Sequence, residues 1–166
     1  MRISAMEEYG LRTLLCLARR ALSVGDIQAA MTIPEMASEE GISVPYTSKI
    51  MRRLRQGGLV KAERGRTGGY HLVREPDKIN LCEALETLGG PMMAVDHCER
   101  YTGVLDSCVH LSDCSLRGAF GGFTGYLKSA LSNTTLADLT EDEAKARTRA
   151  LNSAGNVLGS DVKPIF

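Results

Sequence analysis

The sequence lacks tryptophan, and its only aromatic side chains besides histidine belong to three phenylalanines and five tyrosines. A core must therefore be built mainly from aliphatic side chains. No apolar stretch reaches the roughly 18 residues needed to cross a bilayer, and no signal-peptide segment is present. We therefore expect a cytoplasmic protein with no membrane contact. The chain has no excess of either charge, because 20 Lys and Arg balance 20 Asp and Glu. This excludes a protein that binds nucleic acid through a uniformly basic surface.

The 166 residues suffice for one compact domain, or for a small domain with an arm. A composition of 43% hydrophobic and 24% charged residues is typical of a soluble globular protein. The five cysteines are an odd number, which argues against a complete disulfide framework. In a reducing compartment, clustered cysteines more often bind metals or carry redox chemistry.

The charges are distributed unevenly along the chain. Residues 43–74 contain eight basic side chains and one acidic one, a net charge of +7. The segments before and after it carry −2 and −5. Such a local excess is the electrostatic footprint of a polyanion-binding surface, although a solvated basic face would look the same.

The first half of the chain predicts a helix-turn-helix. Residues 3–22 place apolar side chains at helical spacing, at Leu11, Leu14, Leu15, Ala18 and Leu22. A second helix is predicted to open at Thr32 with a capping box completed by Glu35, and to stop at Gly41. Ser43 is the expected N-cap of a third helix that runs to Gly57. The second and third helices, which are short and joined by a glycine-containing turn, form the helix-turn-helix.

A hairpin is predicted directly after the third helix. Residues 59–62 and 70–73 have strand character, and residues 64–69 between them are rich in glycine and arginine. A helix-turn-helix followed by such a hairpin is a winged helix. The predicted fold class is therefore mainly α with a small β-hairpin wing.

This arrangement, together with the basic charge, favours DNA binding over protein docking, the other use of a winged helix. The start of the third helix would enter the major groove, and the wing would reach an adjacent minor groove. We expect contacts with bases or nearby phosphates from Ser43, Val44, Tyr46, Thr47 and Lys49. Contacts with phosphates or the minor groove are expected from Arg52, Arg53, Arg55, Lys61, Arg64 and Arg66.

The second half predicts a helix over residues 79–88, a long loop over 91–113 and a helix of about 18 residues starting near Leu116. That helix carries Gly118, Gly121, Gly122 and Gly125, which are unfavourable unless another helix packs closely against them. We interpret it as a dimerisation helix. The predicted division is a winged helix-turn-helix over 1–75, a loop and dimerisation helix over 76–139, and a flexible tail over 140–166 that contains one helical stretch.

Three of the five cysteines lie in the loop before the long helix. Cys98, Cys108 and Cys114 are spaced C-x9-C-x5-C, whereas Cys16 and Cys82 occupy apolar helical positions typical of core thiols. Three thiolates on one loop can bind an iron–sulfur cluster. Zinc with His97 or His110 is the alternative, and three unligated thiols are another. The absence of a C-x2-C pair favours the cluster. The candidate fourth ligands in the loop are His97, His110, Asp96, Asp106 and Asp113.

Several segments together carry a family resemblance. They are Met1-Arg2-Ile3-Ser4 with Tyr9 and Leu11, Gly41-Ile42-Ser43 with Tyr46, Leu54-Arg55 with Gly58-Leu59-Val60, the wing residues 64–70, the three-cysteine loop, and residues 135–139. Over roughly residues 1–139 the chain resembles the IscR/NsrR family of bacterial winged-helix transcription regulators. The resemblance implies a homodimer built on the long helix, a cluster in each subunit, and promoter binding controlled by the state of the cluster.

The details are similar to the nitric-oxide-sensing repressors of that family. The cluster-assembly regulators use a histidine three residues after the third cysteine, where this chain has Arg117. In the repressors, a carboxylate near the start of the first helix of the partner subunit completes a [4Fe–4S] site, and the matching position here is Glu8, next to Glu7. Other relatives hold [2Fe–2S]. The alternative, purely structural role of Glu8 is to compensate the dipole of the helix in its first turn.

The resemblance thus implies a dimeric repressor, not an enzyme, that binds a palindromic operator and senses nitric oxide, redox state or iron availability. The alternative is a cluster-free or zinc-bearing winged-helix regulator that responds to a metabolite or to thiol oxidation. An enzyme is disfavoured because no nucleophile–base pair or phosphate-binding loop is apparent.

Overall fold

The computed structural model describes residues 3–65, 68–91 and 97–158, with the backbone alone at position 97 and over 153–158. Its first element, α1 (Ala5–Val24), begins at a capping box. The Ser4 hydroxyl accepts the Glu7 N–H at 3.3 Å, and the Glu7 carboxylate accepts the Ser4 N–H at 2.7 Å. The helix ends at Gly25, whose φ of 72° is left-handed.

The predicted helix-turn-helix is present. Helix α2 (Ile33–Glu40) starts at the capping box of Thr32 and Glu35, and α3 (Val44–Gln56) starts at Ser43. Between them Gly41 takes a φ of 65°, which turns the chain after α2. The Arg12 side chain of α1 joins the end of α2, because its Nε lies 2.7 Å from a Glu40 carboxylate oxygen.

The wing is an antiparallel pair of β1 (Val60–Glu63) and β2 (Gly69–Leu72), in a register that places Val60 opposite Leu72. The backbones of Met31 and Tyr70 exchange two hydrogen bonds of 2.9 and 2.8 Å, which attach the chain before α2 to the wing. Gly69 permits this approach, since a Cβ there would overlap the Met31 carbonyl. The mainly α fold with a β-hairpin wing is confirmed.

One aliphatic core joins these elements. Its fully buried side chains come from α1, α2, α3, the wing and α4, and include Leu14, Leu17, Met36, Ile50, Met51, Leu54, Leu59, Leu72 and Leu88. No ring belongs to the fully buried set, although Tyr9, Tyr46 and Tyr70 pack against it half-buried. The expectation of an aliphatic core is confirmed.

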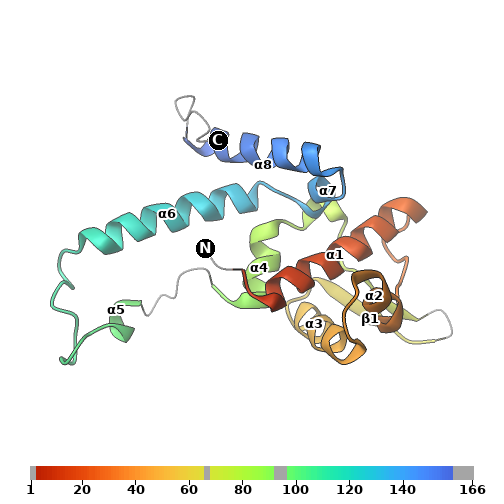
Figure 1. Cartoon of the computed structure of the whole chain (residues 1–166), viewed down its shortest axis with the longest axis horizontal. Helices are drawn as coiled ribbons and strands as arrows, with labels where there is room; N and C mark the ends of the chain where they lie inside the picture. The colour runs from red at the N-terminus through yellow and green to blue at the C-terminus, as the bar shows by residue number, and fades with distance from the viewer. Residues whose placement is uncertain (1–2, 66–67, 92–96, 159–166) are drawn as a thin grey trace.

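The second half continues with the 3-10 turn η1 (Pro76–Lys78), then α4 (Leu81–Gly89), α5 (His97–Arg100) and α6 (Ser115–Ser132). Helix α7 (Leu136–Leu139) folds back on the body and buries Leu136 completely. In Figure 1, α6 and the loop before it extend to one side, away from the winged-helix body.

Residues 140–166, expected to be a tail with one helical stretch, contain α8 (Glu143–Leu158), which packs along α6. The remainder of the predicted tail, 159–166, lies outside the described residues. Among the described helices, none has both the length and the apolar character needed to cross a membrane.

Candidate nucleic-acid interface and cysteine site

The outer face of α3 is open and basic. Ser43 caps the helix by accepting the Tyr46 N–H at 3.4 Å, and Val44 in its first turn is 46% exposed. Farther along, the side chains of Lys49, Arg52 and Arg55 are also exposed. No acidic residue lies in the first turn of α3. The exposed face of α3 therefore presents cations and no carboxylate in its first turn, which suits phosphate oxygens.

Two residues predicted to contact DNA point partly or wholly inward. Thr47 is fully buried, and its hydroxyl donates to the Ser43 carbonyl at 3.1 Å. This corrects the expectation that Thr47 contacts DNA, because its side chain belongs to the core face of α3. Tyr46 is half-buried, with its ring 6.0 Å from the Tyr9 ring in an edge-to-face arrangement. Part of that ring serves to seat α3 on α1.

Arg53 is exposed like Arg52, but it has a partner within the molecule. One guanidinium nitrogen donates to the backbone carbonyl of Leu88, near the end of α4. A phosphate contact from Arg53 stays a prediction, and in the free protein its side chain is bound to α4.

The wing residues lie as expected where the structure describes them. Lys61 in β1 and Arg64 just after it are exposed. Arg66, also predicted to reach DNA, lies outside the described residues. Lys61 and Arg64 thus extend the basic surface from α3 onto the wing, as a winged helix bound to DNA requires.

The three loop cysteines lie near one arginine. Cys98 in α5, Cys108 and Cys114 are each half-buried and in no disulfide. Cys114 is the N-cap of α6, and its sulfur accepts the Arg117 N–H at 3.4 Å. The Arg117 guanidinium donates to the Cys98 sulfur at 3.7 Å and to the Leu111 carbonyl at 3.1 Å. The hydrogen bond with Cys98, and then its charge and those of Cys114 and Cys108, raise the pKa of Arg117.

The donor chemistry of these residues fits an iron–sulfur cluster, for which thiolates are the usual ligands. Within residues 3–65, 68–91 and 97–158, no three His, Cys, Asp or Glu side chains converge on a metal-sized centre. The cysteines instead lie around the Arg117 guanidinium. A cluster bound here would need the loop to draw the three sulfurs together and a fourth ligand from elsewhere.

The candidate fourth ligands occupy different environments. The Glu7 carboxylate is used by the α1 capping box and packs against Gly89, where a Cβ would overlap it. Glu8, one residue on, is exposed at the start of α1. His110, Asp106 and Asp113 are exposed in the loop, while Asp96 and the side chain of His97 lie outside the described part of the chain.

Cys16 is a core thiol, as expected. It is 3% exposed and donates to a Glu39 carboxylate oxygen at 2.8 Å. Burial, followed by the hydrogen bond and charge of Glu39, raises the pKa of Cys16 to about 12. Cys16 is therefore protonated and unsuited to nucleophilic or ligand chemistry.

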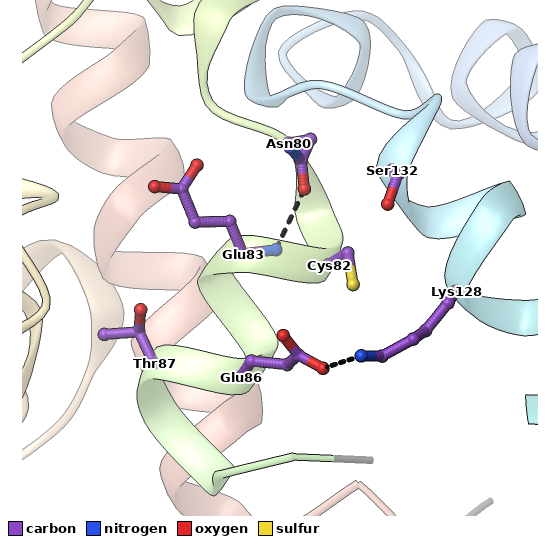
Figure 2. Close-up of a pocket in the computed structure, with 7 residues that line it drawn as sticks. All are labelled: Asn80, Cys82, Glu83, Glu86, Thr87, Lys128 and Ser132. Atoms are coloured by element: carbon purple, nitrogen blue, oxygen red, sulfur yellow. Dashed lines mark hydrogen bonds and ion pairs between the residues drawn. The ribbon is translucent and has the colours of Figure 1, made fainter. Parts of the chain in front are cut away.

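Cys82 lies at a different place, in an open pocket of about 570 Å³ between α4 and α6 (Figure 2). The side chain is 6% exposed. Across the pocket the Glu86 carboxylate lies 2.6 Å from the Lys128 ammonium, and this contact raises the pKa of Lys128. The pair ties α4 to α6.

The sequence reasoning did not anticipate the contacts of Arg117. A side chain three positions after Cys114, on a helix that Cys114 caps, lies one turn along the same face, so the spacing alone contains that signal. By contrast, the Glu86–Lys128 pair joins residues 42 positions apart and had no local signal.

Comparisons with known proteins now decide the family. The profile of the Rrf2 family, described as an iron-dependent transcriptional regulator, matches residues 3–142. The chain belongs to the Rrf2 family. It is therefore a DNA-binding transcriptional regulator rather than an enzyme, and the resemblance to IscR and NsrR is confirmed.

Three relatives illustrate the similarity. CymR of Bacillus subtilis is 30% identical over 149 residues, 88% of this chain and 96% of CymR. Its solved structure, described as the global cysteine regulator, matches with a TM-score of 0.66 at 28% identity, over 84% of this chain and 96% of that one. NsrR of Shouchella clausii is 26% identical over 88% of this chain and 94% of its own length. The T. potens IscR structure has a TM-score of 0.63 at 25% identity, covering 84% and 85%.

Proposed function

We propose that this Rrf2 regulator is a homodimeric repressor whose operator binding is controlled by an iron–sulfur cluster that senses nitric oxide, redox state or iron availability. The observation that carries the proposal is the separation of the five cysteines. Cys98, Cys108 and Cys114 share one loop at the start of α6 and are half-buried, whereas Cys16 and Cys82 lie in the body. Three accessible thiols on one loop match the needs of a cluster.

In this proposal Glu8 of the partner subunit supplies the fourth ligand, as in the resemblance to the nitric-oxide sensors. The exposure of Glu8 and the engagement of Glu7 in its cap support that choice. When bound, a [4Fe–4S] cluster, or a [2Fe–2S] cluster as the alternative, would supply iron that reacts with nitric oxide or oxidants. A carboxylate is a harder ligand than thiolate, so the iron it holds is the more easily displaced.

The dimer is proposed to form through α6. None of its side chains is buried in the single chain. Leu116, Phe120 and Phe123 lie on one face at i, i+4 and i+7 and are 66%, 53% and 70% exposed. No atom comes within 4 Å of a Cβ built on Gly118, Gly121, Gly122 or Gly125. This exposed apolar face suits packing of a second copy, whose two-fold symmetry matches a palindromic operator. At 100° per residue the four glycines lie on the opposite face of α6, which they leave narrow.

The DNA contacts proposed on the exposed basic face are Ser43, Val44, Lys49, Arg52, Arg55, Lys61 and Arg64. The half-buried Tyr46 and Arg66, which lies outside the described residues, are proposed with them. They extend from the start of α3 to the wing. In a symmetric dimer they would occur twice, once for each half-site.

The test is anaerobic purification of the whole chain followed by an absorption spectrum, iron, sulfide and zinc analysis, and operator binding before and after cluster removal. We expect broad visible absorption, iron and sulfide in equal amounts, and different operator affinity of the two forms. Zinc without sulfide, or no metal with unchanged DNA binding, would instead support the cluster-free or zinc-bearing regulator that answers a metabolite or thiol oxidation.

A further inference from the structure

The last turn of α4 lies against both α1 and α3. A Cβ on Gly10 of α1 would overlap the Leu88 side chain, and one on Gly57 at the end of α3 would overlap Thr87. Glycine at both positions thus allows α4 to pack closely against α1 and α3. The end of α4 is therefore packed directly under the helix that is proposed to read DNA.

Arg53 adds a directed bond to this contact. The last four carbonyls of a helix have no partner within it, and α4 has no basic residue in its own last turn. The Glu86 carbonyl accepts the Gly90 N–H at 2.9 Å, and the Leu88 carbonyl accepts the guanidinium of Arg53. A cation at this position also suits the negative end of the helix dipole. Thus α3 supplies a donor to one of the terminal carbonyls of α4, in addition to the Gly90 cap.

Helix α4 also contacts the helix that begins at the cysteine site. Glu86 holds Lys128 of α6 (Figure 2), and Cys114 is the N-cap of that helix. A change at Cys114 therefore has a route to α4 through α6, and Arg53 joins α4 to the DNA-facing helix.

We infer that Arg53, although exposed, is a positioning residue that couples the cysteine site to α3 rather than a phosphate contact. The inference rests on the proposed control of DNA binding by the cluster. It adds the route: α6 transmits a change at Cys114 to α4 through the Glu86–Lys128 pair, and the Arg53–Leu88 bond passes it to α3. Two arrangements of one packed element can carry such coupling.

The experiment compares Arg53→Met, Arg53→Lys and the neighbouring exposed Arg52→Ala in the full-length protein. Operator affinity is measured by fluorescence anisotropy over a range of salt concentrations, for the cluster-bound and the cluster-free forms. Each phosphate contact contributes close to one unit to the log–log salt slope. Thermal unfolding monitored by circular dichroism confirms that each variant is folded.

For Arg53→Met we expect the salt slope to be unchanged in both forms. The ratio of the operator affinities of the cluster-bound and cluster-free forms should move toward one by a factor of about five or more, the lower end of typical coupling. Arg52→Ala should show the opposite, a slope lower by about one and an unchanged ratio. Arg53→Lys keeps the charge but loses the planar fork. Should the Met variant fail to fold, a preserved slope with a reduced ratio in the Lys variant is the expected result.

The inference would be overturned if Arg53→Met lowered the salt slope by about one and left the ratio of the two affinities unchanged. If the Met variant does not fold, an unchanged affinity ratio in folded Arg53→Lys would overturn it. Failure of the proposed function looks different, because the wild-type protein would then bind operator equally well with and without cluster. In that case the coupling role of Arg53 is rejected together with the proposed function. The salt slope of the cluster-free Arg53 variant still shows whether Arg53 contacts a phosphate or only the Leu88 carbonyl.

Discussion

The guanidinium of Arg117 donates to the sulfur of Cys98, 19 positions earlier in the chain, at 3.7 Å. The two residues come from α6 and α5, so the bond closes the cysteine loop on itself. Hydrogen bonds and positive charge beside the sulfurs make reduction of a cluster easier.

Replacing Arg117 by Ala should therefore shift the midpoint potential of the bound cluster to more negative values. The measurement is a redox titration followed by electron paramagnetic resonance, with Arg147→Ala in α8 as a control that removes an exposed charge elsewhere. Equal potentials for wild type and Arg117→Ala would mean that Arg117 leaves the sulfurs when a cluster is bound.

Thiol reactivity should separate the cysteines in the cluster-free protein. Because the pKa of Cys16 is raised to about 12, its thiolate fraction at pH 8 is on the order of 10⁻⁴, and only the thiolate reacts. Iodoacetamide followed by peptide mass spectrometry should label Cys98, Cys108 and Cys114 first and Cys16 only after unfolding. Labelling of Cys16 as fast as Cys108 in the folded protein would contradict the buried, hydrogen-bonded thiol.

The wing should contribute to DNA binding through charge. Arg64→Ala is expected to reduce the log–log salt slope of operator binding by about 0.9, because one phosphate contact is lost. Gel-shift titrations at several salt concentrations measure this, and Arg20→Ala on α1, also exposed, serves as the control. A slope equal to that of the wild type would place Arg64 outside the interface.

Glu7 and Glu8 should have separable roles. Glu7→Ala breaks the capping box with Ser4 and should lower the free energy of unfolding by about 1 kcal/mol, measured by urea titration, with the cluster spectrum unchanged. Glu8→Ala should leave stability nearly unchanged but alter the spectrum of the cluster and its rate of reaction with nitric oxide. If the spectrum responds to Glu7→Ala and not to Glu8→Ala, the ligand assignment is reversed.

The apolar face of α6 should hold the dimer together. Phe123→Asp places a charge where a second copy is proposed to pack, and burying an unpaired carboxylate is strongly unfavourable. We expect monomers in size-exclusion chromatography with light scattering, whereas Leu22→Asp, at an exposed apolar position on α1, should leave the dimer intact. A dimer that survives Phe123→Asp would locate the interface on another surface.

Local features of the sequence were enough to predict much of the fold. The caps at Thr32 and Ser43 depend on residues within four positions, and both helices begin where the caps predict. The wing followed from two short strands around a glycine-rich turn, with bounds displaced by one residue. The division between core and loop cysteines followed from the apolar periodicity around Cys16 and Cys82.

Which basic side chains have an internal partner was decided by the tertiary structure. Arg52 and Arg53 are exposed neighbours with the same charge, yet the Arg53 guanidinium binds the Leu88 carbonyl, 35 positions away. The inward position of Thr47, by contrast, was within reach of the sequence. It shares the stripe of Ile50, Met51 and Leu54 at i, i+3, i+4 and i+7, and all four are buried. Hydrogen-bonding and capping patterns act over a few residues and are written in the sequence. Contacts between helices depend on how the whole core packs, and so only the fold determined which of the exposed arginines binds α4.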